Sequence, residues 1–287
     1  MIPAPFSYHR PGSIAEATAL LSHHSEGRVL AGGQSLIPMM KLRLANPEHL
    51  IDIGGIAELK GVQRTGQTIV IGSATTQHDL QQSQEAIEAA PILLEASLLI
   101  ADPQVRYVGT LGGNIANGDP GNDMPAVMMC LDANYRLASV AGSRTVKAKD
   151  FYEGMYATAL KAGEIVTAIE IPVPAVGHGW AYEKLKRKVG DYATAAAGVV
   201  LTVSGGKIAT CSIALSNLGD TALLAADAAK AVIGTALEKP AIDVAVNAAR
   251  AIMSPASDTR GTPDYRVYVG GVMLERALRK AFSRAKG

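Results

Sequence analysis

Cysteine is almost absent from this chain. Only Cys130 and Cys211 occur among the 287 residues, and each stands in an apolar run. Two thiols do not make a disulfide framework, and an iron–sulfur cluster normally takes four thiolates from its protein. The six histidines show no HxxxH or Cys/His spacing, so the sequence does not support a metal site built within this chain.

An excess of charge of one sign is also missing. Lys and Arg number 27 and Asp and Glu 26, a formal charge of +1, whereas nucleic acid or an anionic membrane as main partner requires a basic excess. The start of the sequence resembles no signal peptide, and the apolar run APILLEASLLIA is short and interrupted by Glu95. We therefore expect a cytoplasmic protein, at most loosely associated with the inner face of the membrane.

The hydrophobic patterns predict mixed secondary structure up to about Pro174. Ser13 and Glu16 stand in capping-box spacing at the start of a helical apolar pattern. Residues 75–100 look helical, with a break or kink at Pro91. Short runs rich in β-branched residues predict strands. These strands are expected at 28–30, 49–53, 68–73, 134–139 and 163–174, with a short helix at 125–133.

After a linker at VGHG, the pattern changes to strands followed by helices. Strands are expected at 179–186, 193–203 and 207–216, and helices at 221–233, 241–253 and 270–282. This order is typical of an antiparallel sheet with helices on one face, and the chain is predicted to be α+β.

Two glycine pairs stand out, in AGGQS (31–35) and TLGGN (110–114). The chain has neither GxGxxG nor GxxxxGK[ST]. Successive glycines can expose several backbone N–H groups to one anion, and each hydrogen bond to a charged acceptor contributes about 1.5–3 kcal/mol. Both loops could thus hold a diphosphate without a lysine. A glycine pair after a strand is also common in plain turns, and spacing alone leaves both interpretations open.

The segments around these loops resemble a known family. AGGQSLIPMMKLRLANPEHLIDI and TLGGNIANGDPGNDMPAVMM are similar to the FAD-binding subunits of molybdenum hydroxylases, and most similar to the medium subunits of aerobic carbon monoxide dehydrogenases. The resemblance continues through LLIADPQVRYVGT, YEKLKRKVGDYATAAAGVVL and DYRVYVGGVMLERAL, and so covers almost the whole chain. It implies a two-part FAD-binding domain of the vanillyl-alcohol oxidase type over 1–175, divided into 1–53 and 54–175. It also implies a C-terminal domain over 178–287, with a three-stranded antiparallel sheet and packed helices.

The same resemblance assigns non-covalent FAD contacts residue by residue. The two diphosphate loops would be Ala31, Gly32, Gly33, Gln34 and Ser35, and Thr110, Leu111, Gly112, Gly113 and Asn114. Close relatives often have histidine where this chain has Gln34, which matters little if the contact is through the backbone. The remaining contacts would be Asp123 to ribose or ribityl hydroxyls, Ile100 and Val166 as apolar contacts, Lys184 as a basic contact, and Tyr192 over the isoalloxazine.

Simpler interpretations of these residues stay open. Lys186 aligns as well as Lys184, and the run KLKRK could be a solvated strand face. Asp123 could merely cap the helix that follows it. Tyr192 could be an ordinary strand aromatic.

The sequence shows no nucleophile–base pair, so no catalytic residue is predicted and the covalent chemistry is expected to belong to the cofactor. The family implies a large partner subunit with molybdenum and a small partner subunit with two [2Fe–2S] clusters, assembled as a dimer of heterotrimers. This chain would pass electrons from the clusters through FAD to an external acceptor such as a quinone. The alternatives are the flavin subunit of a molybdenum hydroxylase for a heterocycle or aldehyde, a self-sufficient flavin oxidase, and a scaffold without FAD. Aromatic residues make up only 5%, which counts against the oxidase and its aromatic-rich lid.

Overall fold

The N-terminal segment forms a small parallel sheet in the order β1–β3–β2. The computed structural model describes residues 2–285. The elements of this segment are β1 (Ser7–His9), α1 (Ile14–His23), β2 (Gly27–Leu30), α2 (Leu36–Lys41), β3 (His49–Asp52) and the 3-10 turn η1 (Ala57–Leu59). The predicted first helix is confirmed. Its capping differs in one detail, because the Glu16 carboxylate accepts the N–H of Gly12 rather than that of Ser13.

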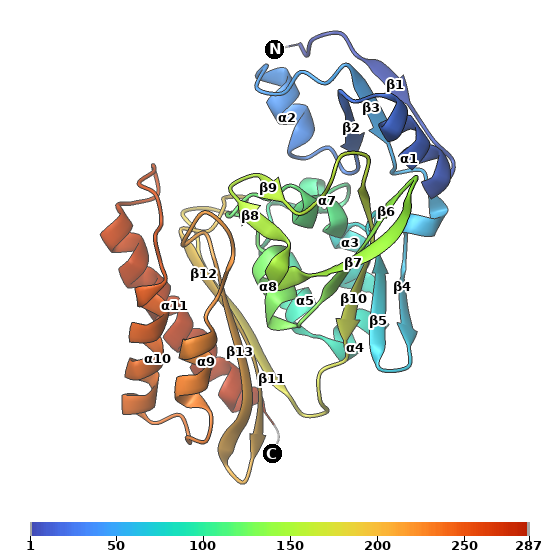
Figure 1. Ribbon diagram of the computed structural model, residues 1–287. Coiled ribbons are helices and arrows are strands. Elements are labelled where there is room, and N and C mark those ends of the chain that lie inside the picture. The colour runs from blue at the N-terminus through green and yellow to red at the C-terminus, as the bar shows by residue number, and fades with distance from the viewer. Residues whose placement is uncertain (1, 286–287) are drawn as a thin grey trace.

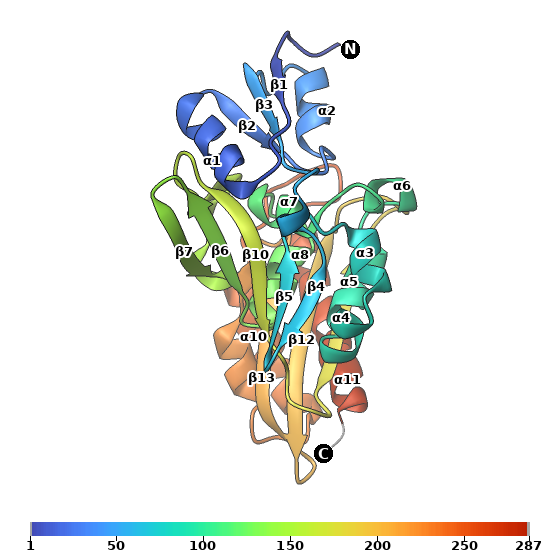
Figure 2. The ribbon, with the colours of Figure 1, turned by 90° about the vertical axis from the view of Figure 1, so that its right-hand side faces the viewer.

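A larger antiparallel sheet follows, in the order β4–β5–β10–β6–β7 (Figure 2). Its strands are β4 (Val62–Thr65), β5 (Thr68–Gly72), β6 (Asn134–Ser139), β7 (Gly142–Lys147) and β10 (Ile165–Pro172). The isoleucines of β5 and the last two of β10 belong to the main core, whereas Ile165 at the start of β10 belongs to a smaller cluster with Ile51 and Ile53. The strands predicted at 68–73 and 163–174 are confirmed. The pattern did not predict β7, because this edge strand, GSRTVK, has few apolar residues and is largely exposed.

Short helices fill the connection between β5 and β6. They are α3 (Gln77–Gln82), α4 (Gln84–Ala89), α5 (Ile92–Leu99), α6 (Pro103–Arg106), α7 (Leu111–Ala116) and α8 (Met124–Cys130). The predicted break at Pro91 is confirmed, since α5 begins directly after it. A second break at Ser83 was not predicted. Ser83 has an extended backbone and its hydroxyl accepts the N–H of Ala86, so it ends α3 and caps α4.

The C-terminal part begins with an antiparallel sheet in the order β11–β12–β13–β14. The strands are β11 (Gly179–Leu185), β12 (Ala195–Ser204), β13 (Lys207–Ser216) and β14 (Leu223–Leu224), followed by α9 (Ala226–Val232), α10 (Lys239–Ala251) and α11 (Pro263–Arg284). The predicted strands and helices are confirmed, except that the last helix begins at Pro263, seven residues before the predicted start at 270, with Thr262 as its N-cap. Within residues 2–285, the two-residue β14 adds a fourth strand to the predicted three, and the first predicted helix starts later because β14 precedes it.

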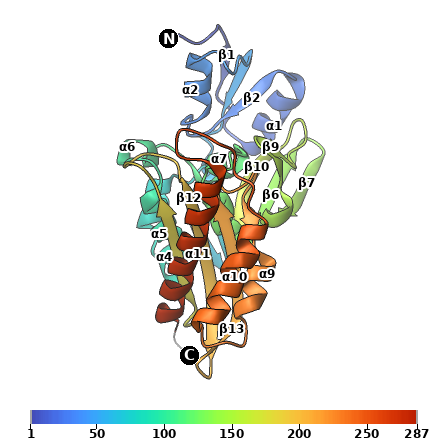
Figure 3. The ribbon, with the colours of Figure 1, turned by 90° about the vertical axis from the view of Figure 1, so that its left-hand side faces the viewer.

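Both faces of the C-terminal sheet are buried. Helices α9, α10 and α11 cover one face (Figures 1 and 3), and α5 and α8 pack on the other. Along β12, Ala197 and Val199 belong to the core under the helices, whereas Ala196 belongs to the core shared with the central sheet. A Cβ at Gly198 would lie 3.1 Å from Cys130 Sγ, so the small residues of β12 let α8 come close. The predicted division near Pro174 falls between β10 and β11 and, as a domain boundary, stays a prediction.

Candidate functional site

The first glycine loop, residues 31–35, connects β2 to α2 and presents unused backbone donors. None of its N–H groups donates a hydrogen bond to another residue of the described part of the chain. Gly33 has φ +69°, a left-handed conformation that glycine adopts without steric cost. The loop is partly exposed, so its amides are accessible to a ligand. Such a run of free N–H groups can bind an anion.

The second glycine segment differs from the expected open loop. Leu111 begins α7, and Thr110 is its N-cap, with the hydroxyl accepting the N–H of Gly113 at 3.0 Å. The N–H of Leu111 donates to Thr75 O at 2.9 Å and that of Gly112 to Ser73 O at 2.8 Å. Four of the five amides, those of Leu111, Gly112, Gly113 and Asn114, therefore donate within the protein, whereas the N–H of Thr110 donates no hydrogen bond among the described residues. The predicted FAD contacts of this segment stay predictions.

The two glycine segments nevertheless lie against each other. A Cβ on Gly32 would stand 2.3 Å from Val108 O and 2.7 Å from Gly109 Cα, so only glycine allows this approach. A Cβ on Gly113 would stand 3.7 Å from Ala31 Cβ. Ala31 and Gly113 are 82 residues apart in the sequence, and the fold brings their two segments into contact. The first loop thus offers free amides. The second segment, at the start of α7, packs against this loop.

Asp123 and Lys184 form a buried ion pair between α8 and β11. Lys184 Nζ lies 2.7 Å from Asp123 Oδ2, and the side chains are only 1% and 5% exposed. The Tyr182 hydroxyl donates to the other oxygen, Asp123 Oδ1, at 2.7 Å. Burial, and then the charge of Asp123, raise the pKa of Tyr182 well above its ordinary value, so this phenol stays protonated. The Asp123 side chain makes no capping bond to α8, so the interpretation of Asp123 as a simple helix cap is wrong.

Lys184 and Lys186, the two candidates for the basic contact, differ in their surroundings. Both ammonium groups donate to Leu99 O, at 3.2 and 3.3 Å. Only Lys184 also pairs with a carboxylate among the described residues, and its side chain is 1% exposed. Burial and the neighbouring charge of Lys184 lower the pKa of Lys186. The site thus contains one cation held by Asp123 and one without an acidic partner among the described residues.

Tyr192 lies at the rim of the GDPGND loop. Its side chain is 40% exposed, and a Cβ on Gly121 would stand 2.8 Å from its ring. The Arg260 guanidinium lies 5.6 Å from the ring centroid. The backbone N–H of Tyr192 donates to Asp191 Oδ1 at 2.9 Å. The sequence analysis did not predict Arg260 as a neighbour of Tyr192. The two residues are 68 positions apart, and no local pattern indicates a contact over that separation.

The two apolar candidates are packed in the core. Ile100 is 7% and Val166 5% exposed, and both belong to the main hydrophobic cluster. The carbonyl of Ile100 accepts a hydrogen bond from Arg106 at 2.8 Å. Little of either side chain is available to a ligand in this conformation. Their predicted contacts with the adenine or flavin stay predictions.

Three of the six histidines, His9, His24 and His49, meet at one end of the N-terminal sheet. Their sequence spacing did not predict this cluster. The three come from different elements, and only the sheet pairing and the end of α1 bring them together.

Comparison with known proteins identifies the family. A family model described as the FAD binding domain in molybdopterin dehydrogenase matches residues 4–174. A second model, the CO dehydrogenase flavoprotein C-terminal domain, matches residues 180–281. The chain belongs to the flavoprotein subunits of the molybdenum hydroxylases. As a member of this family it is an FAD-binding oxidoreductase subunit, and molybdenum and iron–sulfur clusters belong to other subunits of such complexes.

Individual relatives extend over the full length of the chain. It is 59% identical to the carbon monoxide dehydrogenase medium chain of Afipia carboxidovorans, covering 100% of both chains. It is 38% identical to the glyceraldehyde dehydrogenase medium chain of Sulfolobus acidocaldarius, covering 98% of this chain and 99% of the relative. Among solved structures, a Cu,Mo-CO dehydrogenase chain superimposes with a TM-score of 0.98 at 59% identity, covering 99% of this chain and 100% of the other. A chain of quinoline 2-oxidoreductase from Pseudomonas putida 86 gives 0.94 at 33% identity, covering 99% of each.

No helix among residues 2–285 is both long enough and apolar enough to cross a membrane.

Proposed function

We propose that this chain is the FAD-carrying electron-transfer subunit of a molybdenum-containing carbon monoxide dehydrogenase. The supporting observation is the 59% identity, without truncation of either chain, to a carbon monoxide dehydrogenase medium chain. Its partners are a large molybdenum subunit, where substrate is oxidised, and a small subunit with [2Fe–2S] clusters, in a dimer of heterotrimers. Electrons enter this chain from the clusters and leave to a quinone. The assembly is cytoplasmic, with loose contact to the inner face of the membrane.

The residues of the site suit a diphosphate on one side and a ring system on the other. The free N–H groups of residues 31–35 donate to the diphosphate. The packing of Gly32 on Val108 and Gly109 keeps side chains out of that space and holds the loop in place. The second segment, at the start of α7, packs against this loop, and the N–H groups of four of its residues are bonded within the protein. The residues of this segment are Thr110, Leu111, Gly112, Gly113 and Asn114. FAD, when bound, supplies the redox chemistry: it can accept electrons from the clusters and pass them to the quinone.

The second group of residues handles the polar and aromatic parts of the cofactor. The Asp123 carboxylate is an acceptor with lone pairs beyond the two bonds from Lys184 and Tyr182, and these suit ribityl or ribose hydroxyls. Tyr192, half-exposed at the rim, is placed to cover one face of the isoalloxazine and keep water from it. No residue of this chain is assigned a proton transfer. Its task is to bind and orient the cofactor.

A different molybdenum hydroxylase is the second candidate. Relatives named for glyceraldehyde, nicotine and caffeine match at 38%, 33% and 34% identity over nearly the whole chain. The higher identity to two carbon monoxide dehydrogenase medium chains, 59% and 48%, favours carbon monoxide. A self-sufficient flavin oxidase has less support, because these full-length relatives are named as chains or subunits of larger enzymes.

The test is copurification of the tagged chain from its native host. We expect FAD, two further subunits, iron and molybdenum in one complex, and dye reduction that depends on carbon monoxide. The same complex without carbon monoxide turnover would refute the substrate and leave the other hydroxylases. A yellow protein without iron, molybdenum or partners would support an oxidase, and an intact native complex without flavin would refute the FAD site.

A further inference from the structure

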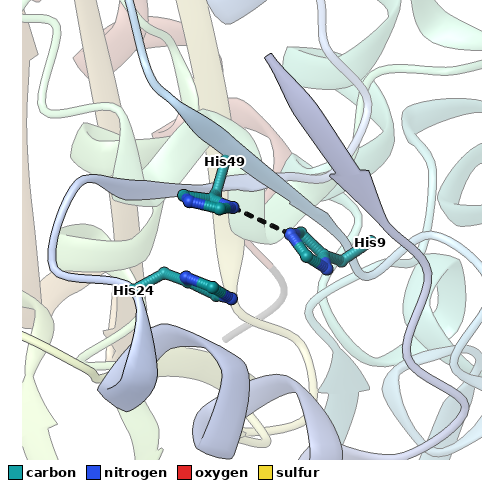
Figure 4. A group of neighbouring side chains, drawn as sticks. All are labelled: His9, His24 and His49. Atoms are coloured by element: carbon teal, nitrogen blue, oxygen red, sulfur yellow. Dashed lines mark hydrogen bonds between the residues drawn. The ribbon is translucent and has the colours of Figure 1, made fainter.

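His9, His24 and His49 form a compact cluster of ring nitrogens (Figure 4). One ligand-type nitrogen from each residue lies within 4.8 Å of the other two. His9 Nε2 and His49 Nδ1 are 2.9 Å apart and share a hydrogen bond. The ring of His24 stacks on that of His49, with centroids 3.7 Å apart. One nitrogen of each of the three rings therefore lies in the same small volume.

The backbone holds each of these side chains in place. His49 begins β3 and His9 ends β1, and the parallel register of these strands puts both side chains on the same face of the sheet. His24 is the residue after α1, and its N–H donates to Leu20 O at 2.9 Å. The N–H of Gly27 returns a hydrogen bond to His24 O at 2.9 Å, and a Cβ at Gly27 would lie 3.5 Å from His24 Cβ. A Cβ at Gly27 would also lie 2.9 Å from both His24 O and Ile51 Cδ1, so glycine allows the backbone after α1 to turn closely onto β3.

The cluster contains more nitrogen donors than its protein contacts use. Among the described residues, no carboxylate forms a hydrogen bond or ion pair with any of the three rings. One hydrogen bond joins two of them, and His24 forms none through its ring. All three residues are partly exposed, so a small ion can reach them from solvent. Three imidazoles without a carboxylate suit zinc, copper or nickel far better than magnesium or calcium.

We propose that His9, His24 and His49 bind one divalent first-row transition-metal ion, with zinc as the reference ion. Zinc–nitrogen bonds of about 2.0–2.1 Å in tetrahedral geometry place ligand nitrogens about 3.3 Å apart. The nitrogens lie within 4.8 Å of one another, and a side-chain shift of about 1.5 Å closes that separation. The His24 ring also turns out of its stack on His49, because the lone pair of a ring nitrogen lies in the ring plane and those of stacked rings do not converge. The ion displaces the proton shared between His9 and His49. Its fourth position stays open to water.

The bound ion joins β1, the end of α1 and the start of β3. These elements build the sheet whose strand β2 leads into the first glycine loop. His49 is level with Gly27 of β2, four residues or about 13 Å before Ala31, and His9 is level with Val29, two residues or about 7 Å before it. The ion therefore shares no ligand with the first glycine loop. It stabilises the N-terminal sheet by binding only its folded form.

The experiment is a zinc titration of the full-length chain made without a histidine tag and stripped with a chelator. Calorimetry is expected to give one zinc ion per chain, and zinc is expected to raise the thermal midpoint. His24→Gln and His49→Gln should each weaken binding at least about tenfold, since even the loss of a supporting residue outside the ligand set costs about 10–100-fold. His78→Gln is the matched control, because His78 stacks on Tyr107 outside the cluster and should bind zinc as the wild type does.

Circular dichroism separates lost binding from misfolding in these variants. If a variant does not fold, the wild type still tests the proposal through zinc X-ray absorption, which should show three imidazoles around the ion. Absence of saturable zinc binding, equal affinity in folded His24→Gln and wild type, or a first shell without imidazole would each overturn the proposal. Since the test measures zinc and not flavin or turnover, its result is independent of the proposed function.

Discussion

Asp123 shows how one buried carboxylate can organise a site. Both of its oxygens accept bonds from the protein, at 2.7 Å from Lys184 and 2.7 Å from Tyr182. Burying two charges is costly, and removal of only one partner leaves the other uncompensated. The pair therefore contributes little net stability as a unit but makes the site intolerant of single changes.

For this reason Lys184→Met should lower the free energy of unfolding by about 3–5 kcal/mol. The double variant Lys184→Met with Asp123→Asn should be more stable than the single variant, because it removes the unpaired charge. Urea denaturation of both, with the wild type, measures the difference. A single variant within about 1 kcal/mol of the wild type would contradict the buried pair.

Asp191 supplies a pH-dependent contribution next to Tyr192. Hydrogen bonds from Arg187, and also from Arg260, lower its pKa from 3.8 to about 2 against the opposing effect of burial. A lowered pKa in the folded state stabilises the fold above the unfolded value of 3.8, and this contribution disappears as the pH falls towards 2. At neutral pH it amounts to about 2 kcal/mol.

Asp191→Asn should therefore cost about 2 kcal/mol at pH 7, and the gap to the wild type should shrink below about pH 4. Urea unfolding from pH 7 down to about pH 3 tests this. Asp227→Asn is the control, because Asp227 is 83% exposed in its pair with Lys230 and should show almost no difference. A gap that does not narrow in acid would refute the role of the Asp191 charge.

At the scale of elements, the first loop and α7 depend on contact between backbones. The approach of Gly32 to Val108 O leaves no space for a methyl group, since a Cβ would stand 2.3 Å away. The preference of Thr110 for an N-cap position turns the second glycine pair into a helix start. The loop with free amides is thus positioned by a neighbouring segment in which four of five amides are bonded within the protein.

Gly32→Ala should push the first loop away from residues 108–109 and so disturb the amides that bind the diphosphate. We expect FAD affinity to fall at least about tenfold, which corresponds to a loss of about 1.4 kcal/mol of binding free energy. FAD content of the purified complex and flavin titration measure this. Gly154→Ala is the matched control, because a Cβ there meets only Ala157 Cβ at 3.8 Å. Equal FAD binding by both variants would refute the placement of the diphosphate at this loop.

At the scale of the whole molecule, Glu95 connects the first part of the chain to its last helix. It accepts bonds from Lys280 at 2.8 Å and Arg284 at 2.5 Å on α11, and from the N–H of Tyr182 at 3.1 Å. Burial alone would raise the pKa of Glu95, but these bonds lower it below its ordinary value. The acid that interrupts an apolar run in the sequence is thus an anchor for α11, which lies along the C-terminal sheet in Figure 3.

Glu95→Gln should lower the free energy of unfolding by about 1.5–3 kcal/mol, the usual contribution of hydrogen bonds to a charged group. Glu275→Gln is the control, since Glu275 pairs only with Arg279 one turn away on the same helix and such pairs contribute about 0.5 kcal/mol or less. Denaturation by urea compares them. Similar losses in the two variants would mean that Glu95 does not tie α5 to α11.

The sequence by itself determined the local structure and the family. The alternation in 163–174 and the helical periodicity in 270–282 depend on neighbours two to four residues apart, so the sequence alone shows them. It did not show that the last helix begins at Pro263. The two glycine pairs marked the two segments that meet at the site. Exposed elements with few apolar residues, such as β7, were not predicted, because an edge strand does not need an apolar pattern.

Only the tertiary structure decided which of these residues meet. Sheet register and helix packing bring Asp123 to Lys184 and join three histidines from three elements. The tertiary structure also decided that the first two N–H groups of α7 donate to the carbonyl groups of Thr75 and Ser73, whereas the N–H groups of the first loop stay free. Long-range contacts of this kind depend on how elements pack, and no local spacing encodes them.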